Sequence, residues 1–349
     1  MPRLSSLEAY NLTAEIFLRC GAPEEEARTV ADHLVDANLC GVDSHGIIRI
    51  PQYVKDVQRG DILPGAEIRR ERETPISAVV DCGWTFGLAG AARAADVAIE
   101  KAQKNHIALV VTRRCNHAGR LGYYAERIAR AGYWVLGFCS SPLHGHFVVP
   151  WGGKDGRLST NPFAYSIPMP DRPPMVADFS TAQAPEGKIR LYRNRKQNLP
   201  EGWILDAHGQ PSISPRDFYG PPQGGILPFG GALGYRGYSL GLLVELMGTI
   251  LAGCSSTEDR PGNGVAFILF DPSLVADEDL LRKNLTELAS YLKSSRPVRD
   301  GGEVLLPGEP EQRMRERRRA EGFEVDPATW SAILEIAANL NVAVEQSGR

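Results

Sequence analysis

The residues best suited to chemistry form a short run around His45. Ser44 and His45 are followed by Arg49 and Tyr53, and the last three recur at intervals of four. Such spacing places three side chains on one face of a helix that begins near His45. A guanidinium grips a carboxylate through two hydrogen bonds, and a histidine exchanges a proton near neutral pH. The run therefore favours proton transfer with a substrate that carries a carboxylate beside a reacting carbonyl or imine.

A purely structural explanation of this run stays open. Ser44 is a favourable residue at the start of a helix, and His45 and Arg49 are ordinary residues of an exposed helix face. In the chemical interpretation, Ser44 instead hydrogen-bonds the oxygen or nitrogen of the substrate at which the proton arrives.

Two further histidine motifs fall in expected loops. Asn116 and His117 follow an expected strand over 107–112, and residues at the carboxyl end of a strand often face a ligand crevice. Asn116 is equally suited to capping the next helix. The His144-Gly145-His146 pair has a spacing that can bind a metal, but acids and further histidines with ligand spacing are missing. We expect no metal site, and keep as the alternative function a metal-dependent hydrolase that uses His117, His144 and His146.

Glycines are concentrated over 230–237, immediately before an expected helix. Backbone N–H groups at such a position can bind an anion, and Arg236 adds positive charge. The run is neither the Gly-x-Gly-x-x-Gly turn of Rossmann domains nor a Walker A loop. A plain tight turn is the alternative.

The elements that must position these residues alternate in type. The first sixty or so residues read as a small helical unit, with a capping box at Ser5–Glu8 and acidic residues after Pro23. A β-α-β-α-β pattern follows, which is typical of an α/β layer. The chain is rich in Pro and Gly over 142–237. Strands are expected at 76–81, 107–112, 134–139, 163–167, 175–179 and 265–270, and helices at 6–20, from Pro23, and at 47–58, 87–104, 119–131, 238–252, 277–292, 309–321 and 327–340.

Composition limits the class of protein. The 349 residues correspond to roughly two domains, and 39 basic against 42 acidic residues give a net charge of −3. That balance argues against a nucleic-acid partner. The six cysteines are scattered, with no Cys-x-x-Cys pair, and we interpret them as reduced, buried residues. Without an apolar signal core or a membrane-length apolar stretch, we expect a cytoplasmic protein with no membrane partner.

Taken together, the motifs resemble the malate/L-lactate dehydrogenase family of non-Rossmann NAD(P)-dependent oxidoreductases, whose members include 2,3-diketo-L-gulonate reductase, ureidoglycolate dehydrogenase, sulfolactate dehydrogenase and Δ1-piperideine-2-carboxylate reductase. Seven stretches run in family order along nearly the whole chain. They are GVDSHGIIRIPQYV (41–54), NHAGRLGYYAERIARAGYWVLGF (116–138), PWGGKDGRLSTNPFAYSIP (150–168), ADFSTAQAPEGK (177–188), LPEGWILDAHGQPSISP (199–215), LPFGGALGYRGYSLGLLVELMGTILAG (227–253) and LPGEPE (306–311).

This resemblance implies an α/β fold of the non-Rossmann, sulfolactate dehydrogenase-like kind, with a mixed sheet, an N-terminal helical unit and C-terminal helices. It implies a homodimer that transfers hydride reversibly between a nicotinamide cofactor and a small 2-oxo/2-hydroxy acid or cyclic 2-imino acid. The residues that it assigns to catalysis and substrate binding are His45 as proton donor or acceptor, Arg49 for the carboxylate, Ser44, Tyr53 and His117 in the pocket, and Asp206 as a partner that orients or charges the histidine.

The resemblance also implies a cofactor site and a division of the chain. The implied cofactor residues are Asn161, Ser180, Thr181, Ala182, Lys188, Tyr235, Arg236, Gly308, Glu309 and Pro310. Arg236 departs from the lysine of many relatives, which changes its reach. The basic residues at 190, 193, 195 and 196 favour NADPH over NADH, because cations suit the 2′-phosphate; a solvated basic loop is the alternative. We expect an N-terminal unit (1–70), a substrate and dimer region (71–140 and 255–349) and a cofactor region (141–254).

Overall fold

A computed structural model describes residues 2–257, 260 and 262–344 of the chain. The N-terminal unit is helical as predicted, with α1 at Ser6–Arg19, α2 at Glu24–Leu39 and α3 at Ile50–Gln58. The capping box at the start of α1 is confirmed, since Ser5 and Glu8 exchange hydrogen bonds between side chain and backbone.

The helix expected over 47–58 forms as α3, but it begins at Ile50 and not near His45. Two separate 3-10 turns, Asp43–His45 and Ile47–Arg49, precede α3. The break lies at Gly46, where an added Cβ would sit 2.2 Å from Asn38 Oδ1. That oxygen accepts the Ile47 N–H at 2.8 Å, so the amide of Asn38 holds the break in place. His45 and Arg49 consequently project from turns rather than from one helical face.

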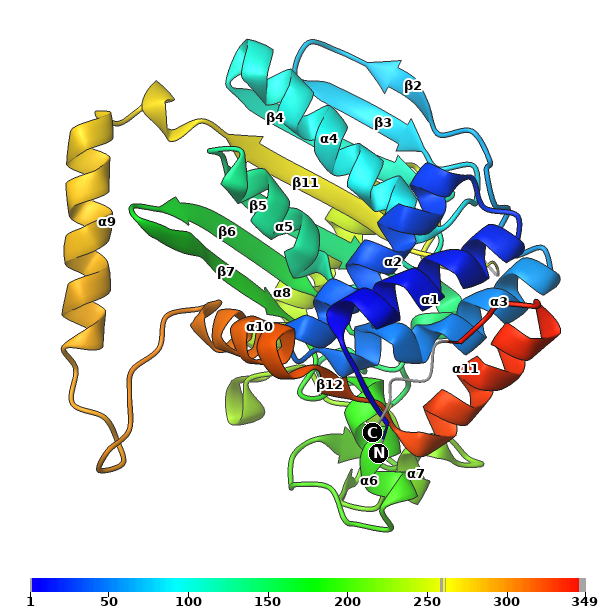
Figure 1. Cartoon of the computed structure of the whole chain (residues 1–349). Coiled ribbons are helices and arrows are strands. Elements are labelled where there is room, and N and C mark those ends of the chain that lie inside the picture. Colours follow the sequence, from blue (N-terminus) through cyan, green and yellow to red (C-terminus); the bar gives the residue numbers. More distant parts are fainter. Residues whose placement is uncertain (1, 258–259, 261, 345–349) are drawn as a thin grey trace.

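A mixed sheet forms the centre of the molecule, as predicted, and it has seven strands (Figure 1). Only β3 and β4 are parallel, and every other neighbouring pair is antiparallel. The strands are, in spatial order, β2 Arg69–Glu73, β3 Ser77–Asp81, β4 Ile107–Arg113, β11 Gly264–Phe270, β5 Trp134–Ser140, β6 Phe163–Met169 and β7 Arg172–Phe179.

Helices cover both faces of this sheet (Figure 1). The helices α4 (Gly87–Asn105) and α5 (Leu121–Arg130) pack on one face, and α8 (Tyr235–Glu245) packs with the π-helical turn Leu246–Ile250 on the other. The central strand β11 is almost wholly buried, because layers lie above and below it. The sheet thus supports α4 and α5, and the start of α5 lines the site described below.

Several elements are absent from the sequence prediction. They are β2, the helices α6 (Glu186–Asn194) and α7 (Pro215–Tyr219), and the small antiparallel sheet of β10 (Gly225–Ile226), β8 (Ile204–Leu205) and β9 (Pro211–Ser212). In β2 the run Arg-Arg-Glu-Arg-Glu has no apolar alternation, because it is an exposed edge strand. In α6 only Ile189 is buried, so the helical period is hidden. The domain division stays a prediction, although β6 and β7 of its cofactor region pair into the main sheet.

The C-terminal part returns to the N-terminal unit. Strand β1 (Arg3–Leu4) pairs with β12 (Phe323–Glu324), and α11 (Pro327–Asn339) shares an apolar core with the first helices. Between them, α9 (Glu278–Lys293) stands away from the body, and α10 (Glu309–Glu321) lies between α9 and the main body (Figure 1).

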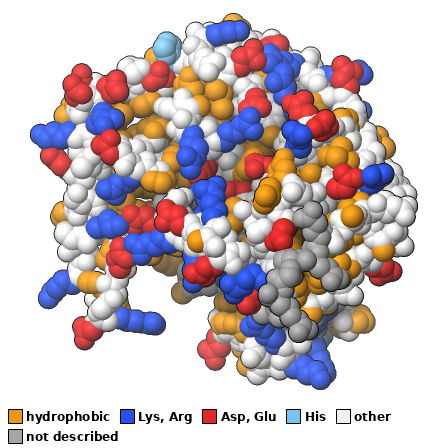
Figure 2. All heavy atoms as spheres, viewed as in Figure 1, with side chains coloured by type: hydrophobic (Ala, Val, Ile, Leu, Met, Phe, Trp, Pro, Cys, Tyr) orange, Lys and Arg blue, Asp and Glu red, His pale blue; other side chains and the backbone are white. Residues whose placement is uncertain are grey.

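The surface carries both signs of charge. Figure 2 shows acidic and basic side chains interspersed over this face rather than gathered by sign, as the net charge of −3 suggests. Across the described residues, no helix combines the length and apolar character needed to cross a bilayer.

Candidate active site

One open cleft of about 1250 Å³ brings much of the predicted site together. Its walls are the turns before α3, the loop between β4 and α5, the end of β7, the start of α6 and the start of α10. The predicted residues that line it are Ser44, His45, Arg49, His117, Ser180, Lys188 and Gly308. The cleft therefore joins the expected proton-transfer residues to part of the expected cofactor residues.

Three side chains form a layered group at one end of the cleft. The rings of His45 and His117 stack with centroids 5.6 Å apart. Behind them the Tyr53 hydroxyl hydrogen-bonds His117 Nδ1 at 2.6 Å, and Tyr53 is only 1% exposed. Tyr53 thus supports His117 from behind instead of lining the pocket. On the open side, Ser44 Oγ lies 3.1 Å from His45 Nδ1.

The surroundings of His45 disfavour its protonated form. Burial, then the charges of Arg49 and Arg120, lower the pKa of His45 from its ordinary value to about 3. Burial, Arg49 and His45 likewise hold the pKa of His117 well below its usual range. At neutral pH, His45 is therefore a neutral imidazole and able to accept a proton.

Arg49 is placed to bind an acid from outside the chain. Its Nε donates to the Ser44 carbonyl at 2.7 Å, and Nη1 donates to Gln52 Oε1 at 2.7 Å. Within the part of the chain that the structure describes, no carboxylate forms an ion pair with it. A guanidinium fixed by neutral acceptors keeps its full charge for a ligand.

The loop that carries His117 is held from several sides. The Asn116 amide donates to the carbonyls of Asp61, Trp84 and Thr85, so Asn116 ties loops together and does not cap α5. Gly119 has φ +71°, and an added Cβ there would lie 2.3 Å from His33 Nε2. These contacts fix the direction of the His117 ring.

The turn that carries His45 is fastened to α10. Arg318 binds both oxygens of Asp43, at 2.6 and 3.1 Å, and the Asn38 amide donates to Asp43 at 2.7 Å. The C-terminal helices therefore help to hold the candidate catalytic turn.

The expected cofactor residues divide into two groups. Ser180, Lys188 and Gly308 lie in the cleft. The others belong to the surrounding scaffold. Asn161 is fully buried and donates to Glu245, and Thr181 and Ala182 are buried. Glu309 binds Lys293 at 2.7 Å, and Pro310 lies in the first turn of α10. Tyr235 and Arg236 are exposed at the start of α8, outside the cleft lining, with the guanidinium 5.7 Å from the tyrosine ring centre.

Asp206 is not brought to His45. It does not line the cleft, and its Oδ1 accepts the backbone N–H groups of His208 and Gln210 in the turn between β8 and β9. The structure thus gives Asp206 a turn-stabilising contact in place of the expected one with the histidine.

The geometry for a metal-dependent hydrolase is also lacking. Among the described residues, no three or more His, Cys, Asp or Glu side chains converge as a metal would require. His117 is committed to Tyr53 and His45, and the side chain of His144 lies outside what the structure describes.

Comparison with known proteins identifies the family. The family model for malate/L-lactate dehydrogenase matches residues 4–334. The chain belongs to this family. It is 32% identical to hydroxycarboxylate dehydrogenase B of Escherichia coli, over 98% of this chain and 96% of that protein.

Solved structures give the same result. Sulfolactate dehydrogenase from Methanocaldococcus jannaschii matches with a TM-score of 0.88 and 32% identity, over 98% of each chain. Δ1-Piperideine-2-carboxylate reductase from Pseudomonas syringae matches with a TM-score of 0.85 and 27% identity, over 97% of this chain and all of that one. The chain is thus an oxidoreductase of the dehydrogenase type with the predicted fold, and the hydrolase alternative has no support.

A dehydrogenase of this family implies a nicotinamide cofactor, and the cleft has features that suit one. Its volume exceeds that of most small-molecule pockets. Gly308 (φ +91°) approaches β7 so closely that a Cβ would lie 3.0 Å from the Val176 nitrogen. Lys188 is exposed and supplies positive charge to the lining. An anionic, elongated cofactor is therefore compatible with the residues present.

Sequence reasoning missed several residues of the cleft. Arg120 lines it but lies outside the predicted residues. Asp178 and Glu186 also line it without having been singled out, although the resemblance implies that the cofactor contacts the 178–188 loop in which they lie. Arg120 directly follows the Asn116–Gly119 motif at the end of a strand, which is the one local signal that pointed to it.

Proposed function

We propose that this enzyme transfers hydride reversibly between NAD(P)H and carbon 2 of a small 2-oxo/2-hydroxy acid or cyclic 2-imino acid. The observation that carries the proposal is a neutral His45 in one cleft with Arg49, a guanidinium free of carboxylate partners among the described residues. Relatives named as hydroxycarboxylate and sulfolactate dehydrogenases support the class of substrate.

Each residue has a defined part in this proposal. Arg49 binds the substrate carboxylate, and His45 exchanges the proton at the oxygen or nitrogen on carbon 2. Ser44 hydrogen-bonds the same atom, while His117, backed by Tyr53, forms the neighbouring wall. Nicotinamide, when bound, supplies or accepts the hydride. A carboxylate on Arg49 offsets one cause of the low His45 pKa, which helps His45 to act as donor in the reductive direction.

We propose that NADPH is preferred, held in part by Ser180, Lys188 and Gly308. In α6, Lys188 and Arg190 line the cleft, whereas Arg193 lies 3.9 Å above the Tyr219 ring. Arg190 forms an ion pair with Glu186, which also lines the cleft. Michaelis constants for NADPH and NADH measured with one substrate decide the preference.

The test of the proposed function is an absorbance assay with a panel of 2-oxo acids and cyclic 2-imino acids. Purified protein should consume reduced cofactor in the presence of at least one of these two classes of substrate. Absence of turnover with the whole panel, together with absence of cofactor binding by calorimetry, contradicts the proposal.

The pH dependence of hydroxy-acid oxidation should reflect a neutral His45. A lowered histidine pKa means that the base form persists as the pH falls, and that base activity is lost only as the pH passes through about 3. We therefore expect kcat/KM to stay flat through the region around pH 6.5, measured at pH values where circular dichroism shows the folded protein. A half-maximal point near pH 6.5 would contradict the assigned environment of His45.

We also propose that the protein is a homodimer and that the outer face of α8 lies in the interface. Leu243 of α8 is 43% exposed, and Leu246, the first residue of the π-helical turn that follows, is 46% exposed. Patches of this kind are rare on monomers. Light scattering should give the mass of two chains, and Leu246→Asp should give one. Leu7→Asp, at an exposed leucine of α1, is the matched control and should leave the mass unchanged.

A further inference from the structure

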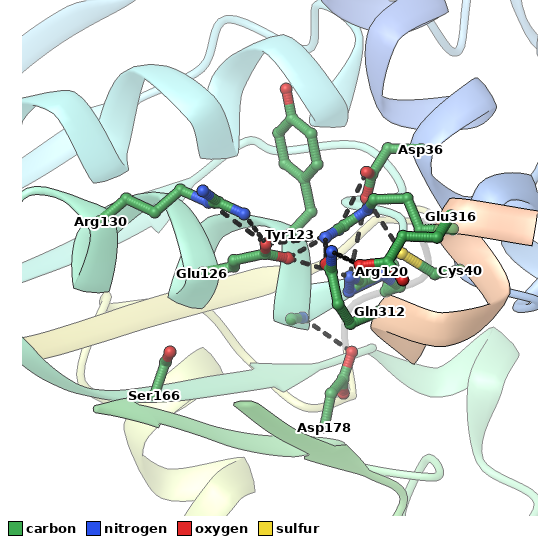
Figure 3. Close-up of polar contacts among 12 residues, drawn as sticks. Asp36, Cys40, Arg120, Tyr123, Glu126, Arg130, Ser166, Asp178, Gln312 and Glu316 are labelled. Atoms are coloured by element: carbon green, nitrogen blue, oxygen red, sulfur yellow. Dashed lines mark hydrogen bonds and ion pairs between the residues drawn. The ribbon is translucent and has the colours of Figure 1, made fainter. Parts of the chain in front are cut away.

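Arg120 is a buried cation on the wall of the cleft that the proposed chemistry does not use. Its side chain is 5% exposed, and it comes from the residue just before α5. Figure 3 shows it among Asp36, Cys40 and Glu126. Its Nη2 lies 3.6 Å from Asp36 Oδ2 and 3.7 Å from Glu126 Oε2, beyond hydrogen-bonding distance. The hydrogen bond that its guanidinium does make is to a sulfur, Cys40 Sγ, at 3.4 Å.

The neighbouring acids are turned toward a different arginine. Arg315 binds both oxygens of Glu126, at 2.9 and 2.7 Å, and lies 3.0 Å from Asp36. Arg120 Nε has no partner among the described residues, and neither does Arg315 Nε. A guanidinium has five N–H donors, and leaving them unused in a buried position costs free energy. Arg120 therefore has two carboxylates at ion-pair distance but unused N–H donors, and a ligand in the cleft can supply acceptors for them.

Arg120 also lies within electrostatic reach of the proposed reacting centre. It is one of the two cations that lower the pKa of His45, and the other is Arg49. Its backbone N–H donates to His33 Nε2 at 2.8 Å, which fixes the start of its side chain. The nearby acid Asp178 is engaged in turn, because its Oδ2 accepts the Gly122 N–H at 2.7 Å. Two guanidiniums, those of Arg49 and Arg120, thus act on His45 from the cleft. Arg49 is already assigned to the carboxylate next to carbon 2.

We propose that Arg120 is a specificity-determining residue that binds a second acidic group of the substrate, a carboxylate or sulfonate beyond carbon 2. This inference rests on the proposed function, because it assumes that Arg49 holds the first carboxylate. A phosphate of the cofactor has the same anionic chemistry, and the experiment separates the two sources.

The experiment compares (S)-malate with (S)-2-hydroxybutyrate, which share a four-carbon chain and differ in the second carboxylate. The wild-type enzyme should have the higher kcat/KM with malate. Arg120→Gln should lower kcat/KM for malate about 100-fold, since a buried charge loses its partner, and leave 2-hydroxybutyrate within about threefold. The kcat/KM of Arg120→Lys for malate should lie between those of the wild type and Arg120→Gln. The control Arg130→Gln removes a charge from the same cluster, at a residue outside the cleft lining, and should change neither value much.

Each outcome has a distinct meaning. If the wild-type enzyme has the same kcat/KM with 2-hydroxybutyrate as with malate, the inference is overturned and the proposed function stays intact. This outcome does not depend on whether the Arg120 variants fold. Loss of both substrates in Arg120→Gln, with a raised dissociation constant for the cofactor, also overturns it and assigns Arg120 to a cofactor phosphate. Turnover of no 2-hydroxy or 2-oxo acid at all contradicts the proposed function itself.

Discussion

Replacement of His45 by glutamine should reduce kcat about 1,000-fold, which lies within the usual contribution of a positioned acid or base. Glutamine fills a similar volume and can still hydrogen-bond Ser44, but it cannot exchange a proton at pH 7. The affinity for the cofactor should be unchanged, because His45 is not among the residues proposed to hold it. Steady-state kinetics with the best substrate of the panel measure the first effect, and calorimetry measures the second.

The matched control for this variant is His208→Gln. His208 is exposed in the turn between β8 and β9 and does not line the cleft. It should keep full turnover. Loss of a general acid or base should reduce kcat far more than threefold. If the kcat of His45→Gln stays within about threefold of the wild-type value, His45 is not the proton-transfer residue.

Replacement of Arg49 by glutamine should raise KM for the acid substrate about 100-fold, because a charged hydrogen-bonding partner of the carboxylate is lost. Arg49→Lys should recover part of this loss, since an ammonium supplies the charge but not the two-pronged geometry. Glutamine should also let the pKa of His45 rise, because Arg49 is the second-largest cause of its depression. Initial rates over a wide range of substrate concentration measure KM.

Arg28→Gln provides the comparison for Arg49. Arg28 is exposed on α2, pairs with Glu24 on the surface and does not line the cleft. The KM of Arg28→Gln for the acid substrate should match that of the wild type. An unchanged KM in Arg49→Gln would show that another residue binds the carboxylate.

The sequence predicted elements well where local signals decide them. The capping residues of α1 and the Gly-Glu-Pro start of α10 place those helices within a residue of their bounds. The position of β11 between β4 and β5 was not predictable in this way, because pairing across more than 120 residues leaves no local mark. The charged edge strand β2 was not predicted either, because an exposed strand does not need the apolar alternation that marks a strand in the sequence.

The candidate site shows the same division. His45 and Arg49 were found by residue type and spacing, but both precede the helix expected to carry them. The chain breaks at Gly46, where Asn38 Oδ1 accepts the Ile47 N–H. Tyr53 therefore lies behind His117 and not beside His45. Asp206 was expected at the histidine because the family resemblance implies it, but its carboxylate accepts hydrogen bonds within its own turn. Arg120 escaped notice because its chemistry depends on burial, and burial is a property of the folded chain.

The contact between Arg318 and Asp43 has a consequence for synthesis of the protein. These residues are 275 positions apart, and the turn that carries His45 is fastened by the later one. Translation proceeds at about 5–20 residues per second, so the N-terminal helices emerge from the ribosome well before their fastening residue exists. A nascent chain arrested before α10 should thus contain every residue assigned to proton transfer and still be inactive, and activity should appear only once the ribosome has passed that helix.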